Sequence, residues 1–120
     1  MIDHVILNVG DVARSRAFYV EALKPLGYDI VMEFPRGVGF GPAGKPIFWV
    51  SGREPAQTAV HVAFSAERRE TVDEFHAAAL KAGGKDNGGP GLRKQYHPSY
   101  YGAFILDPDG NNVEAVCHRP

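Results

Sequence analysis

The chain has 120 residues, which is enough for one domain with a buried core. Its apolar content of 44% and charged content of 22% are ordinary for a globular protein, and a net charge of −1 argues against binding to nucleic acid or an anionic membrane. It contains no apolar run of the roughly 18 residues that cross a bilayer. No export signal is visible, and Cys117 is the only cysteine, so we expect a protein of the reducing cytoplasm.

The first half of the chain predicts a strand, a helix and three further strands. Within residues 4–9, the apolar residues Val5, Leu7 and Val9 occupy every second position, which is typical of a strand with one buried face. Residues 12–26 have apolar side chains at helical spacing, with Asp11 placed to cap the helix and Gly27 to end it. Short strands are then predicted over 29–34, 37–41 and 46–50.

The second half predicts the same series of elements. A strand over 60–65 precedes an amphipathic helix over 68–82, and further strands are expected over 85–87, 100–106 and 112–117. The sequence Asp-Pro-Asp-Gly at 107–110 is typical of a tight turn, so the last two strands should form a hairpin. Residues 83–91 contain five glycines and are interpreted as a flexible loop or lid.

The two halves are also related by sequence. A shift of 57 residues aligns them with seven identities over the 24 positions from His4 to Gly27, and it places His4 on His61. This repeat predicts an α+β domain of two βαβββ modules, about 1–54 and 55–120. If the modules pack as pseudo-symmetric mates, their first strands lie side by side, with His4 and His61 on adjacent central strands.

Three side chains in these strands are candidate metal ligands. The alternation directs His4 and His61 away from the face that packs on the helices, and it directs Glu114 opposite to its neighbours Val113 and Ala115. A carboxylate among apolar residues requires a partner, and two imidazoles around one divalent cation would supply it. Such a set leaves coordination positions open, as in catalytic metal sites.

Simpler interpretations of these residues remain open. A histidine in a strand is more often a hydrogen-bonded residue than a ligand. Glu114 could instead pair with Arg93, Lys94 or Arg119.

Three motifs of the chain resemble a known superfamily. They are His4-Val5 near the N-terminus, Phe18-Tyr19 in the first helix, and Asp-Pro-Asp-Gly-Asn at 107–111 before a strand containing Val113-Glu114. Together they are similar to the glyoxalase/bleomycin-resistance/extradiol-dioxygenase (vicinal oxygen chelate) superfamily.

The resemblance covers essentially the whole chain. It implies modules that curl into a curved mixed sheet, a cup around one divalent ion (Zn, Fe, Mn or Ni), and a homodimer. It matches the family's ligands to His4, His61 and Glu114. A fourth ligand of the glyoxalase type is missing, because residues 47–51 contain no acid.

Further candidates surround the expected cup. We assign His97 and Tyr101 to proton transfer and Trp49 and Tyr100 to the substrate pocket. The alternation allows only one of the two tyrosines to face the cavity, and the geometry of the preceding turn decides which. His97 could equally be an exposed loop residue, and the aromatic residues could be ordinary packing residues.

The leading functional hypothesis is a metal-dependent lyase or isomerase acting on a small oxygenated organic substrate. The metal would act as a Lewis acid on two vicinal oxygens. One alternative is an extradiol-type dioxygenase using the same His/His/Glu site. Another is a metal-free drug-binding resistance protein. We expect a small-molecule partner and a second copy of the chain, with neither nucleic acid nor membrane.

Overall fold

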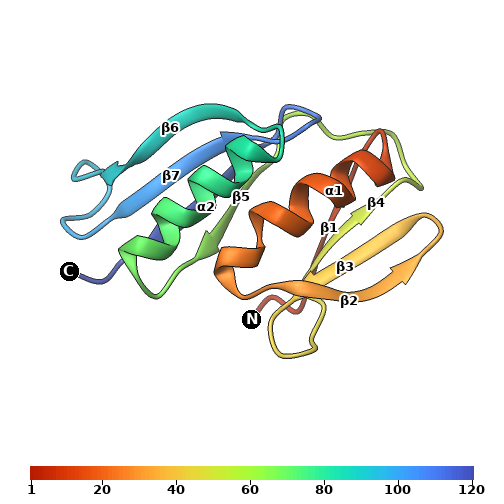
Figure 1. Ribbon diagram of the computed structural model, residues 1–120, viewed down its shortest axis with the longest axis horizontal. Helices are drawn as coiled ribbons and strands as arrows, with labels where there is room; N and C mark the ends of the chain where they lie inside the picture. Colours follow the sequence, from red (N-terminus) through yellow and green to blue (C-terminus); the bar gives the residue numbers. More distant parts are fainter.

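The computed structural model describes all of residues 1–120. Two helices lie side by side across the molecule, each covering one face of a four-stranded sheet (Figure 1). The first module contains β1 (Val5–Asn8), α1 (Val12–Ala22), the 3₁₀ turn η1 (Lys24–Leu26), β2 (Asp29–Phe34), β3 (Gly37–Gly41) and β4 (Phe48–Ser51). The second contains β5 (His61–Ser65), α2 (Arg69–Lys81), β6 (Lys85–Leu92), β7 (Tyr101–Leu106) and β8 (Asn112–Cys117).

The two sheets have the same topology, and the predicted fold class is confirmed. Their strand orders are β1-β4-β3-β2 and β5-β8-β7-β6, so each first strand is parallel to the last strand of its own module. The helices begin at Val12 and Arg69, which differ by the 57 residues of the sequence repeat. The molecule is therefore an α+β fold of two βαβββ modules.

One hydrophobic core joins the modules on the helix side of the sheets. The repeat-equivalent Phe18 and Phe75 are both fully buried there. Helix α1 starts where the sequence predicts, because the Asp11 carboxylate accepts a hydrogen bond of 3.0 Å from the backbone N–H of Arg14. Gly27 ends the following 3₁₀ turn with a φ of +82°, a conformation that favours glycine. The opposite face of each sheet is left for polar and aromatic side chains.

The expectation that the first strands are adjacent in one sheet is wrong for the single chain. β1 and β5 are edge strands of separate sheets, and no ladder joins them. Side chains separate the two edges: the rings of Phe48 and Phe64 meet with centroids 5.2 Å apart, and an apolar cleft of about 270 Å³ lies beside Val5 and Val62. The two candidate histidines are consequently held in different sheets.

The expectation of a flexible loop over 83–91 is also wrong. Most of this segment belongs to β6, which pairs antiparallel with β7. The register shifts on either side of Gly88, and Pro90 lies in the second irregular stretch. An edge strand tolerates glycine and proline at such irregularities, because only one side of it forms a ladder. Neither helix, of 11 and 13 residues, has the length and hydropathy to cross a membrane.

Candidate metal centre and adjoining pocket

The second module brings together two of the three predicted ligands. β5 and β8 are parallel neighbours, and their register places Ala63 opposite Glu114. His61 begins β5, and its Nε2 lies 2.8 Å from Oε1 of Glu114. Glu114 is only 1% exposed, whereas the His61 side chain is about half exposed. A buried carboxylate thus faces an imidazole that is open to solvent.

The second oxygen of this carboxylate is held by Tyr100, whose hydroxyl donates a hydrogen bond to Oε2 of Glu114. Burial is the main cause that raises the pKa of Tyr100 above its ordinary value, and the hydrogen bond to Glu114 is the second cause. Tyr101 points the other way, because its hydroxyl donates to Oδ1 of Asp73 on α2 at 2.6 Å. The structure therefore differs from the assignment of Tyr101 to catalysis: Tyr100 is the tyrosine beside Glu114.

His4 lies in the first module, just before β1. Its Nδ1 is 2.8 Å from Oδ1 of Asp3, and its side chain is about half exposed. No group of three or more His, Cys, Asp or Glu side chains in the chain lies close enough to hold a metal ion. The structure thus brings His61 and Glu114 together but leaves His4 apart from them.

The His61–Glu114 pair places two possible metal-donor atoms close together. Two ligand atoms about 2.1 Å from one ion lie about 3.0 Å apart at a right angle and about 3.4 Å apart at the tetrahedral angle. The observed separation of 2.8 Å is that of a direct hydrogen bond, slightly shorter than either spacing. Imidazole nitrogen with carboxylate oxygen is also a donor set used for zinc, iron and manganese. The residues present therefore fit part of a metal site, and a third protein ligand would have to come from outside this cluster.

The position equivalent to Glu114 in the first module is occupied by Trp49. Glu114 lies opposite Ala63 on the first strand of its module, and the repeat maps Ala63 onto Ile6. The register of β1 and β4 places Trp49 opposite Ile6. The missing fourth ligand is thus replaced at the same place in the fold by an indole ring.

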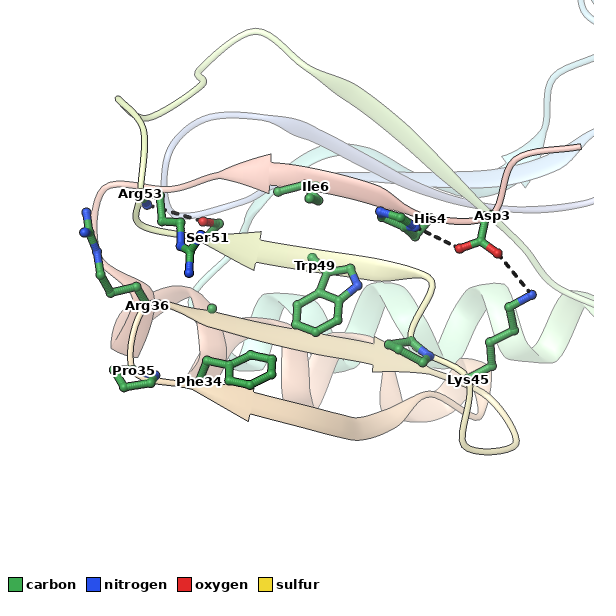
Figure 2. Close-up of a pocket in the computed structure, with 12 residues that line it drawn as sticks. Asp3, His4, Ile6, Phe34, Pro35, Arg36, Lys45, Trp49, Ser51 and Arg53 are labelled. Atoms are coloured by element: carbon green, nitrogen blue, oxygen red, sulfur yellow. Dashed lines mark hydrogen bonds and ion pairs between the residues drawn. The ribbon is translucent and has the colours of Figure 1, made fainter.

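Trp49 lies in the larger of the two described cavities, a pocket of about 660 Å³ on the open face of the first sheet. His4 and Ile6 line this pocket from the β1 side, and Phe34 lines it from β2. Figure 2 shows these side chains on the near side of the sheet, with the helices behind it. The volume is within the range of small-molecule sites, about 300–1,000 Å³.

The remaining candidates surround Glu114 less closely. His97 is exposed in the turn before β7, where its Nδ1 accepts a hydrogen bond from the backbone N–H of Ser99. Its ring lies 5.8 Å from that of His118, which in turn lies 5.2 Å from that of Tyr100. The only ion pair of Glu114 is with His61, so none of the basic residues considered as alternatives is its partner.

Sequence reasoning did not single out Phe34, Arg36 or Arg53, which also line the pocket. One signal was present, because residues 37–41 alternate glycine with larger apolar residues. Val38 and Phe40 are in the core, so the glycines lie on the opposite face, where Gly37 lines the pocket and Gly39 lies beneath Trp49. The arginines gave no comparable signal, since both lie in turns with no periodic pattern.

Paired βαβββ modules with a buried carboxylate beside a histidine define the class of the protein. A family model of the Glyoxalase/Bleomycin resistance protein/Dioxygenase superfamily matches residues 1–115, and the chain belongs to this superfamily. It is 27% identical over 128 residues to protein YqjT of Bacillus subtilis, covering 95% of this chain and 96% of that one.

Solved structures agree with this assignment. A glyoxalase/bleomycin resistance protein from Albidiferax ferrireducens is 30% identical, with 98% of each chain covered and a TM-score of 0.83. A lactoylglutathione lyase from Agrobacterium tumefaciens is 21% identical, with 98% of this chain and 92% of that one covered and a TM-score of 0.72. At that identity the likeness concerns the fold alone.

Proposed function

We propose that the protein is a metal-dependent enzyme of the lyase or isomerase type that acts on a small oxygenated organic substrate. The observation that carries this proposal is the buried carboxylate of Glu114, 2.8 Å from the solvent-open imidazole of His61. Burying a carboxylate without a full positive charge beside it is costly, and a divalent cation would offset that cost. The ligands are His61, Glu114 and His4.

His4 is supplied by a second copy of the chain. In a symmetric dimer, the first module of one protomer lies beside the second module of its partner, and two identical sites form. The edge strands favour such an arrangement: β1 and β5 each have one unpaired side, and Ile2 and Ile6 are 79% and 52% exposed. Unpaired edges with exposed apolar side chains are usually covered by another strand or chain.

In this proposal each residue near the metal has a separate task. A bound divalent ion supplies Lewis-acid chemistry for vicinal oxygens of the substrate. Glu114 provides the only negative charge of the ligand set, and Tyr100 orients it by donating to Oε2. A tyrosine hydroxyl has an ordinary pKa of about 10 and is protonated at neutral pH, so Tyr100 acts as a donor to the carboxylate rather than as a base. Proton transfer falls to His97, since imidazole is the commonest general acid–base group.

The test is the metal content of purified protein after incubation with Zn²⁺, Mn²⁺, Fe²⁺ or Ni²⁺. We expect about one ion per chain in the wild type and a large loss in Glu114→Gln, which keeps the side-chain volume but removes the charge. Asp86→Asn is a matched control, because Asp86 forms a second acid–histidine pair with His76 at 3.0 Å on α2 and β6. Equal metal retention in the wild type and Glu114→Gln would contradict the proposal. Oxygen uptake with catechols would instead indicate the extradiol dioxygenase.

A second candidate is a metal-free protein that binds a drug-like aromatic molecule. Two observations favour it. Trp49 occupies the position of a fourth ligand, and both oxygens of Glu114 already have partners within the chain. This candidate predicts no stoichiometric metal and unchanged ligand binding in EDTA.

A further inference from the structure

The pocket of the first module is built entirely from one chain. It lies on the strands β1, β4, β3 and β2, and Trp49 is at its centre (Figure 2). A charged group lies at each end: Arg36 and Arg53 at one end, and His4 with its neighbours at the other. The chemistry of the floor and of the two ends specifies what the pocket can hold.

The floor of the pocket is flat and aromatic. Trp49 lies against Gly39 on the neighbouring strand β3, and a Cβ atom added at Gly39 would come within 2.8 Å of the indole. The ring of Phe34 is nearly parallel to that of Trp49, at an interplanar angle of 14° with centroids 6.1 Å apart. Figure 2 shows the two rings side by side on the open face. Such a surface favours stacking of a planar conjugated group.

The two ends of the pocket differ in available charge. At the His4 end, Asp3 lies 2.8 Å from Nδ1 of His4 and 3.6 Å from Nζ of Lys45, so its negative charge is already partnered. At the other end, Arg36 and Arg53 form no ion pair. Nη2 of Arg36 donates to the carbonyl oxygen of Gly52 at 3.1 Å, which fixes one edge of the guanidinium and leaves its other donors free. Unpaired guanidinium groups favour a carboxylate, which they can bind in a bidentate manner.

We propose that this pocket binds a planar aromatic carboxylate. The conjugated ring lies on Trp49 and Phe34, and the carboxylate lies between Arg36 and Arg53. The opposite end of the ligand then faces His4, which is a metal ligand in the proposed function. That this ligand is the substrate rests on the proposed function, but its binding requires only the one chain.

Trp49 makes the binding measurable, because it is the only tryptophan of the chain and forms the floor of the pocket. The probe is trans-cinnamate, added while tryptophan fluorescence is followed in EDTA and again with added Zn²⁺. Cinnamamide keeps the shape of the probe without its charge, and 3-cyclohexylpropanoate keeps the charge without the flat ring. We expect saturable quenching by cinnamate below about 1 mM and binding about tenfold weaker for each control compound.

Substitutions test the charged end and the aromatic floor of the pocket separately. Arg36→Gln combined with Arg53→Gln should remove the preference for cinnamate over cinnamamide while retaining the binding of cinnamamide. Gly39→Ala should displace the indole and weaken both ligands. Arg68→Gln, in the second module, is the control and should change neither. Circular dichroism establishes that each variant is folded.

Equal affinity for cinnamate and cinnamamide, or no saturable quenching in folded wild-type protein, would overturn the proposal. The outcomes also separate it from the proposed function. If the preference for cinnamate holds in EDTA while Glu114→Gln retains as much metal as the wild type, the proposed metal site is wrong and the proposed ligand pocket is supported. If Glu114→Gln loses metal but cinnamate does not bind, the proposed ligand class is wrong and the proposed metal site is supported.

Discussion

Replacing Tyr100 by phenylalanine tests which tyrosine supports the candidate metal centre. The Tyr100 hydroxyl is the partner of Oε2 of Glu114, a side chain that is 1% exposed. Removing the hydroxyl leaves a buried carboxylate oxygen without a partner, at a cost of about 1–3 kcal/mol. For a chain of this length, 1 kcal/mol shifts the melting temperature by roughly 3–6 °C. A central cost of about 2 kcal/mol therefore lowers it by roughly 6–12 °C.

Tyr101→Phe is the matched control. Its hydroxyl donates to Asp73, which is exposed on α2 and regains water when the donor is removed. The expected cost is about 0.5–1 kcal/mol. Thermal unfolding of both variants, followed by circular dichroism in EDTA at neutral pH, measures the difference. If Tyr101→Phe is as destabilising as Tyr100→Phe, or more so, the assignment of Tyr100 to the site is refuted.

Two further predictions concern buried tyrosines of the chain. Tyr19→Phe should lower the free energy of unfolding by about 1–3 kcal/mol, because the buried Tyr19 hydroxyl donates to Oδ2 of Asp107 at 2.5 Å. Denaturant titrations measure this change, and an unchanged unfolding midpoint would contradict the prediction. Burial and, at Tyr19 and Tyr100, a neighbouring carboxylate raise the tyrosine pKa values in the folded state. Unfolded tyrosines lose their protons first, so stability should be retained below about pH 10 and fall as the pH rises through the folded-state values. In an absorbance titration at alkaline pH, phenolate should appear at higher pH in the folded protein than in urea, and coincident curves would refute the shift.

The sequence predicts the module architecture well, because local patterns determine it. Phe18 and Phe75 recur at the same place in the repeat and are both buried against the sheets. Asp11 caps its helix through a contact within one turn of the chain. Strand alternation correctly directs His61 and Glu114 to the same face, where they meet. These features depend on neighbours in sequence or on the register of two strands within one module.

Other features depend on packing that no local pattern encodes. The separation of β1 from β5 reflects contact between the rings of Phe48 and Phe64, from different modules. The choice between Tyr100 and Tyr101 is set by the turn before β7, which decides where the strand alternation starts. β6 forms despite its glycines, because β7 supplies a ladder that outweighs low strand propensity. The pocket combines residues from four strands and from the connections between them, so its arginines are recognised only in three dimensions.

The central claim is that the metal site joins His61 and Glu114 of one chain to His4 of another. Mixing His4→Ala chains with Glu114→Gln chains tests it directly, after unfolding and refolding them together at equal concentrations. Each variant alone should bind little metal. In a mixed dimer, one site carries both substitutions and the other carries neither. Because about half of the dimers are mixed, the refolded mixture should regain about one quarter of the wild-type metal content. A mixture that binds no more metal than the separate variants would contradict a site shared between chains.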